Sequence, residues 1–126
     1  MSEDTDSHVQ ALNSAQKQMY ENRFEAALDT LRPVLEAAPD HTDALYMQAV
    51  SCRYLKRFDE ARAALDRIKR TTPDFGRAFQ EEGHLLRQLD EPARALTAYQ
   101  RACQFNPALV ASWRAQAELL QAAGRA

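Results

Sequence analysis

The sequence predicts an all-α protein, and three observations support this. Of its 126 residues, 23 are alanine and 14 are leucine, both strong helix formers. Residues that favour strands are scarce, with 4 valines, 1 isoleucine and 6 threonines. Residues of one size class recur every 34 positions, a spacing typical of stacked helical hairpins. The length suits a single domain, and 45% hydrophobic with 27% charged residues is the balance of a globular chain.

Prolines mark the repeat most clearly, because Pro39, Pro73 and Pro107 follow one another at this same step. Small residues keep the step at Ala15, Ala49, Gly83 and Ala117, and again at Ala27, Ala61 and Ala95. Large residues keep it at Leu31, Leu65 and Tyr99. Several types of residue thus recur at the same 34-residue spacing in three successive repeats. This pattern predicts repeated pairs of helices, with small residues where the two helices of a pair approach closely.

Seven helices follow from this period and from the local start and stop signals. They are expected over residues 8–21, 24–37, 42–55, 58–71, 76–89, 92–105 and 110–123. Asp40 and Asp74 are candidate N-caps, and Pro92 suits the first turn of its helix. Pro33 falls inside the second helix, so we expect a kink there or an unpaired carbonyl at Asp29.

The predicted organisation is an acidic tail over residues 1–7 and a repeat domain over 8–126. The domain holds repeats at about 8–41, 42–75 and 76–109 and a capping helix at 110–123. That last helix looks like the first helix of a fourth repeat. Two interpretations compete, a natural end and a cut in a longer protein. We favour the cut, because Leu119 and Leu120 would otherwise face little.

The residues at the repeated positions resemble the tetratricopeptide repeat, a helix–turn–helix unit of the same length. The second half of its motif, A-x-x-x-F…P, is matched by Ala27…Leu31…Pro39 and its two successors. The first half is matched less well, because Ser14, Gln48, Glu82 and Gln116 stand where the family prefers leucine. The resemblance implies a right-handed α-solenoid of three helix pairs plus a C-terminal capping helix.

The resemblance also implies a concave groove, lined by the first helix of each repeat, that binds a peptide or a partner domain. Its N-terminal half is apolar and aromatic, and its C-terminal half is basic. An apolar anchor followed by acidic groups would suit it, although the same side chains could simply pack between neighbouring helices. The predicted groove residues are Leu12, Gln16, Tyr20, Tyr46, Met47, Val50, Arg53, Tyr54, Arg77, Gln80, His84, Arg87 and Arg114.

One subtype of the family grips an acidic chaperone tail with a carboxylate clamp of lysine, asparagine and arginine. The matching positions here hold Leu12 with Gln16, then Met47, then Arg77 with Glu81. Only Arg77 is of a residue type that the clamp uses, so the sequence disfavours binding of that tail.

A second resemblance covers the segments Asp74–Arg87 and Asn106–Ala115. They are similar to the N-terminal repeats of bacterial proteins that fuse tetratricopeptide repeats to a sulfotransferase domain. This implies that the chain positions a substrate for, or braces, a catalytic domain further along a longer bacterial protein. The present segment is predicted to be non-enzymatic.

Several other functions are disfavoured. The 3 glycines are too scattered for a phosphate-binding loop. His8, His41 and His84 lie in different repeats, which argues against a metal site. His84 lies one turn from Glu81, and we expect a neighbouring carboxylate to hold it. We predict no cofactor, no nucleic acid and no membrane contact, and a cytoplasmic location.

The charges are unevenly distributed. Residues 1–43 carry 9 acidic and 3 basic groups, and a basic block follows. We interpret the block as a solvated face, because acidic residues interleave with it. The acidic start could instead meet the basic block of another copy, which would make the chain a self-association module. The basic block consists of Lys56, Arg57, Arg62, Arg67, Lys69 and Arg70.

Overall fold

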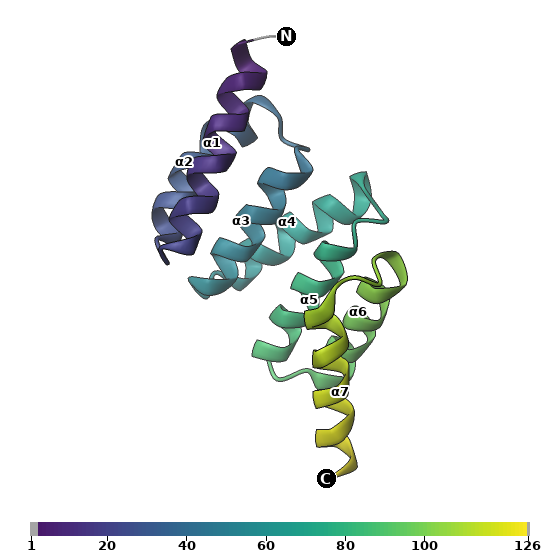
Figure 1. The fold of residues 1–126 in the computed structure, drawn as a ribbon. Coiled ribbons are helices and arrows are strands. Elements are labelled where there is room, and N and C mark those ends of the chain that lie inside the picture. The colour runs from purple at the N-terminus through teal and green to yellow at the C-terminus, as the bar shows by residue number, and fades with distance from the viewer. Residues whose placement is uncertain (1–2, 126) are drawn as a thin grey trace. The chain divides into compact units, whose positions relative to one another are not determined.

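Amphipathic segments, separated by short turns, form the helices of this chain. The computed structural model describes residues 3–125, with side chains from residue 7 onward. Over residues 3–125 it contains seven helices and no strand (Figure 1). The helices are α1 (Glu3–Tyr20), α2 (Phe24–Ala37), α3 (Thr42–Tyr54), α4 (Phe58–Thr71), α5 (Gly76–Gln88), α6 (Pro92–Phe105) and α7 (Val110–Gly124).

The chain forms two units, with α1–α4 in unit 1, which ends at Thr71, and α5–α7 in unit 2. In unit 1, consecutive helices pack against each other and α1 also contacts α3. The predicted small residues Ala15 and Ala27 are completely buried where α1 meets α2. Leu31 and Val34 of α2 complete this core together with Ala44 of α3. The small residues allow the close helix approach that the sequence predicts.

Unit 2 repeats this arrangement with α5 packed on α6 and α6 packed on α7. Its core contains Leu86 of α5, Tyr99 of α6 and Leu119 of α7, with alanines between them. Tyr99 is completely buried. The 34-residue alternation of small and large residues is therefore confirmed for the three helix pairs, whereas Ala117 of α7 is exposed.

The first helix of each pair ends in the same turn. Asn22, Lys56 and Asp90 have φ of 61°, 62° and 59°, in the left-handed region, and they again occupy one position of the repeat. The amide one residue later donates to a carbonyl five positions back, as Arg57 N does to Cys52 O at 2.8 Å. This is the Schellman closure of a helix C-terminus. It explains why each first helix ends where it does although no glycine stands in these turns.

Three local predictions need correction. α1 begins at Glu3 and not at residue 8, so residues 3–7 of the predicted acidic tail are helical; acidic residues favour the first turns of a helix. The N-caps of α3 and α5 are His41 and Phe75, each one residue after the predicted aspartate.

His41 caps α3 through Nδ1, which accepts from the Ala44 amide at 3.2 Å. Asp40 is instead ion-paired with Arg67 of α4 at 2.7 Å. Pro33 lies within α2 without ending the helix. The proline ring removes one amide donor from an exposed face, where water can bond the freed carbonyl.

Candidate functional site

A pocket in unit 1 gathers four of the predicted groove residues at the C-terminal ends of α1 and α3. Gln16 and Tyr20 come from α1, and Val50 and Tyr54 come from α3. Met19 and Asn22 also line it, and Phe24 closes it from the start of α2. We call these seven residues the aromatic pocket.

Tyr54 is held in place although its side chain is exposed. Its ring stacks on Phe24 with centroids 4.5 Å apart and an angle of 2° between the planes. The guanidinium carbon of Arg53 lies 4.5 Å from the centre of the Tyr54 ring. Stacking and cation–π contacts each contribute about 0.5–1.5 kcal/mol. These two contacts therefore fix the orientation of the Tyr54 ring in the pocket wall.

Tyr20 forms the open side of the aromatic pocket. It is 83% exposed, whereas Tyr54 is 56% exposed. Met19 lies deeper, where it lines the pocket and also packs against the unit 1 core. An apolar floor below two accessible tyrosines is suited to burying one apolar side chain of a ligand.

The other predicted residues of unit 1 lie outside this pocket. Leu12 and Met47 are half-buried and pack against the core. Tyr46 is half-buried on α3. Packing between the helices therefore accounts for Leu12 and Met47, as the alternative interpretation of the sequence allows.

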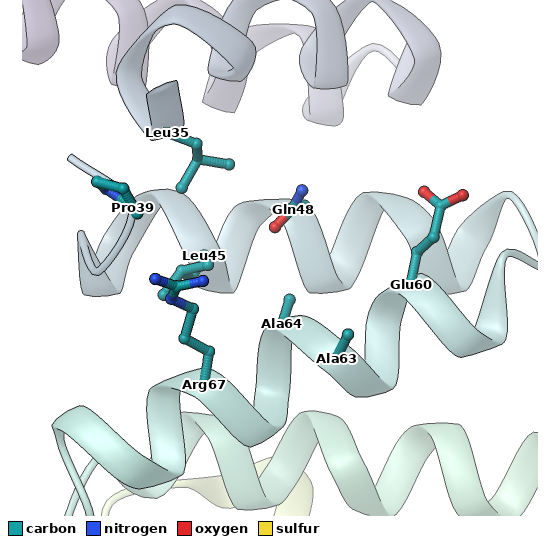
Figure 2. Close-up of a pocket in the computed structure, with 8 residues that line it drawn as sticks. All are labelled: Leu35, Pro39, Leu45, Gln48, Glu60, Ala63, Ala64 and Arg67. Atoms are coloured by element: carbon teal, nitrogen blue, oxygen red, sulfur yellow. The ribbon is translucent and has the colours of Figure 1, made fainter. Parts of the chain in front are cut away.

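A second pocket of unit 1 is formed by α2, α3 and α4 (Figure 2). Its apolar lining includes Leu35 and Leu45, and two charged residues, Glu60 and Arg67, lie two turns apart on α4. Arg67 is already paired with Asp40. None of the predicted groove residues lines this pocket. Its residues are Leu35, Pro39, Leu45, Gln48, Glu60, Ala63, Ala64 and Arg67.

In unit 2, three predicted groove residues on α5 are engaged within the unit. Gln80 Oε1 accepts from Ser112 Oγ of α7 at 2.7 Å. Nδ1 of His84 lies 2.6 Å from Oη of Tyr99, in hydrogen-bonding contact. Arg87 forms an ion pair with Glu118 of α7 at 3.0 Å, and the hydrogen bond to that carboxylate raises the pKa of Arg87.

These contacts change what the basic half of the predicted groove can offer. Glu81, the carboxylate expected beside His84, is itself buried. Arg77 and Arg114 are exposed, and among residues 7–125 neither has a hydrogen bond or ion pair with another side chain. Of the three predicted groove arginines in unit 2, these are the two whose donors face solvent.

Cation–anion pairs account for much of the basic block in unit 1. Arg57 pairs with Glu25 of α2, and Arg67 pairs with Asp40. Lys69 lies 3.7 Å from Asp66 on the same helix. The side chains of residues 1–6 lie outside the described part, so the proposed contact of the acidic start with a second copy stays a prediction.

Neither cysteine is placed for nucleophilic chemistry. Cys52 is completely buried, and burial together with nearby Glu60 raises its pKa to about 11. Cys103 is also buried. Gln116 of α7 covers it, with Nε2 3.2 Å from Sγ. Burial raises the pKa of Cys103 as well.

The described residues contain neither a metal-binding cluster nor a helix that could span a membrane. Between residues 3 and 125 no three histidine, cysteine, aspartate or glutamate residues lie close enough together to hold a metal ion. The helices in that range are all too short or too polar to cross a membrane.

Family models match most of the chain. Residues 12–74 match one tetratricopeptide repeat model, and residues 76–109 match another. The chain therefore belongs to the tetratricopeptide repeat family, and the helices of residues 3–125 form an all-α helical repeat fold. The search of curated proteins found no match.

Solved structures support the same fold. The first TPR domain of human RPAP3 matches with a TM-score of 0.84 and 16% identity, covering 94% of this chain and 93% of that chain. The first TPR of Spaghetti (RPAP3), bound to the HSP90 peptide SRMEEVD, has a TM-score of 0.82 and 16% identity, with 94% of both chains covered. A Thermobaculum terrenum O-GlcNAc transferase has a TM-score of 0.88 and 18% identity, over 95% of this chain but 23% of that one. At these identities the likeness shows the fold alone, and the sulfotransferase resemblance stays a prediction.

Proposed function

We propose that this chain is a protein-interaction module that binds a peptide or partner segment through the aromatic pocket. The observation that carries the proposal is the stack of Tyr54 on Phe24 beside Arg53. Exposed aromatic side chains that are already ordered bury large area at low entropic cost, and such residues dominate binding energy at interfaces.

The chemistry of the pocket indicates the kind of ligand. Met19 and Val50 provide an apolar floor, and the tyrosine hydroxyl groups remain polar at the rim. An aliphatic or aromatic anchor side chain fits this composition. In unit 2, exposed Arg77 and Arg114 each offer a fork of donors for a carboxylate, so this unit by itself is suited to an acidic group.

Two of the matched structures are TPR domains bound to peptides that end in EEVD, from HSP90 and HSP70. They support a peptide as the class of ligand. The clamp residues expected for an acidic chaperone tail are missing here, since Leu12 and Met47 are apolar and pack against the core, and Glu81 is acidic and buried. We therefore propose a ligand with an apolar anchor rather than that tail.

A displayed library of random peptides tests the proposal. Peptides selected by the chain should share an apolar anchor, and Tyr54→Ala should weaken the best of them at least tenfold, equivalent to about 1.4 kcal/mol. Tyr54 is half exposed, so the variant should stay folded. Arg101→Ala, an exposed truncation on α6, is the control and should bind as the unmodified chain does.

Arg77→Glu tests the preference for acidic groups separately. In this variant, acidic peptides should bind more weakly, and the binding of neutral peptides should be unchanged. If no peptide is selected, or if both Tyr54→Ala and Arg77→Glu bind with unchanged affinity, the groove is not the binding site.

A further inference from the structure

The second pocket of unit 1 is lined by a carboxylate and an amide that the described side chains leave largely unpaired. Glu60 Oε2 accepts a weak hydrogen bond from the Cys52 thiol, with Sγ 3.8 Å away, and among residues 7–125 this carboxylate forms no ion pair. The half-buried amide of Gln48 has no hydrogen bond to any residue in the same range. Such a pair of groups is suited to a ligand that carries a positive charge and several hydrogen-bond donors.

Glu60 gives one end of the pocket a negative charge. Figure 2 shows Glu60 and Arg67 at opposite ends of the pocket. The nearby cations do not neutralise Glu60. Arg57, one turn earlier, is ion-paired with Glu25 of α2, and Arg67 has its own carboxylate partner. Arg62 lies on a different face of α4, because residues two apart on a helix do not face each other.

The lining between these two ends is mostly apolar. Leu35 of α2, Leu45 of α3, and Ala63 and Ala64 of α4 surround a cavity of about 320 Å³. This volume is at the lower end of the range for ligand sites, about 300–1,000 Å³. At a rise of 1.5 Å per residue, Ala64 lies about 6 Å along α4 from Glu60. The cavity can therefore hold an apolar side chain about one helical turn from a bound cation.

The helical repeat does not require these two polar groups. The positions that correspond to Glu60 hold Ala26 one repeat earlier and Arg94 one repeat later. Gln48 stands where the family prefers leucine, and its counterpart Gln116 is hydrogen-bonded within unit 2. Gln48 lacks such a bond within the described part of the chain. Packing of unit 1 therefore explains neither Glu60 nor Gln48.

We propose that the second pocket of unit 1 binds a lysine or arginine side chain of a partner protein together with an apolar neighbour of that side chain. The cation donates to the Glu60 carboxylate and to the carbonyl oxygen of Gln48. Its aliphatic stem and the apolar neighbour pack between Leu35 and Leu45. The pocket shares no residue with the aromatic pocket, so this inference does not depend on the proposed function.

A displayed library of random peptides, screened against the Tyr54→Ala chain, tests the proposal with the aromatic pocket disabled. The selected peptides should carry lysine or arginine close to an apolar residue. Adding Glu60→Lys should weaken their binding at least tenfold, and this difference should shrink as the salt concentration rises. Adding Ala63→Trp should weaken their binding as strongly, because it fills the cavity from an exposed position.

Two matched variants serve as controls. Asp59→Lys makes the same change of charge in the first turn of α4, at an exposed residue that does not line the pocket. Ala93→Trp adds the same bulk at an exposed position of α6. Both should leave binding unchanged. A selected peptide whose basic residue is replaced by glutamate should bind the Glu60→Lys chain at least fivefold more tightly than it binds the parent chain.

Several results would overturn the proposal: no selected peptide, selected peptides without a basic residue, binding that survives Glu60→Lys or Ala63→Trp, or an equal loss in Asp59→Lys. Acidic peptides that depend on Arg67 would also overturn it, because the partner would then carry the opposite charge. None of these results bears on the aromatic pocket, which is tested in the unmodified chain.

Discussion

Gly83 lies directly against the ring of Tyr99. A Cβ atom at Gly83 would be 2.7 Å from Cδ1 and Cε1 of that ring, closer than carbon atoms approach without displacement. The two preceding repeats pair alanine with leucine at these positions, as Ala15 with Leu31 and Ala49 with Leu65. The third repeat pairs the smallest residue with the largest.

Gly83→Ala should therefore destabilise the chain, although alanine favours helix more than glycine does. Tyr99 is completely buried and cannot move aside without disturbing the unit 2 core. We expect a loss of about 1–3 kcal/mol in the free energy of unfolding, typical of overpacking. Chemical denaturation of the variant and the unmodified chain measures the difference.

The double variant Gly83→Ala with Tyr99→Leu recreates the pair of the earlier repeats. Tyr99→Leu alone should destabilise, because it leaves a cavity and removes the contact with His84. The double variant should lose less free energy of unfolding than the sum of the losses in the two single variants, by about 1 kcal/mol or more. If the losses of the two single variants simply add, the Tyr99 ring does not limit the size of the side chain at position 83.

Lys56→Gly should stabilise the chain. Lys56 has a φ of 62°, which a side chain with a Cβ atom adopts at a cost. Glycine adopts it freely, and we expect a gain of about 1 kcal/mol. Lys56→Ala is the control for loss of the charged side chain and should give no comparable gain. A thermal midpoint that rises equally in both variants would contradict this reason.

Two buried serines on first helices should respond oppositely to alanine. Both are 0% exposed. Ser51 Oγ has no hydrogen-bond partner among the described residues, whereas Ser112 Oγ donates to Gln80. Ser51→Ala should raise the free energy of unfolding by up to about 1 kcal/mol, and Ser112→Ala should lower it by about 1 kcal/mol. Loss of stability in Ser51→Ala would indicate a bonded hydroxyl, for instance through water.

Cys52 should make the fold sensitive to alkaline pH. Burial, followed by the charge of Glu60, raises the pKa of its thiol from 9.0 to about 11. The unfolded chain therefore loses the proton first. The contribution of the protonated Cys52 thiol to the free energy of unfolding is complete below pH 9.0, and it is lost as the pH rises toward about 11.

Urea unfolding of the unmodified chain and Cys52→Ala across this range isolates the effect from other titrating groups. The variant should lose less stability with rising pH, whatever its stability at neutral pH. Thiol reagents at mildly alkaline pH should react with Cys52 at the rate of unfolding. Parallel pH curves for the two chains would contradict the prediction.

Much of the fold follows from the sequence because size and spacing decide helix packing. The 34-residue step sets both the close contacts at Ala15 and Ala27 and the ends of most helices. The N-caps were not predictable from residue preference, because Asp40 pairs with Arg67 of α4 and His41 takes its place. Such competition depends on tertiary contacts.

The candidate site was only partly predictable. Helical geometry identified Tyr20 and Tyr54, but it considered the first helices alone and missed Phe24. An aromatic residue at the start of α2, repeated as Phe58 at the start of α4, was the available signal. The engagement of Arg87 by Glu118 also needed the structure, because the two side chains lie on different helices, far apart in the sequence.

The left-handed residue that closes each hairpin has a consequence for how such a protein grows. Asn22, Lys56 and Asp90 occupy one position with unlike chemistry, since main-chain bonds and not side chains form the closure. An in-frame duplication of residues 42–75 would carry its own joint with it. A chain that lengthens by gene duplication therefore needs no new linker sequence. The side chains at these turns can still diverge.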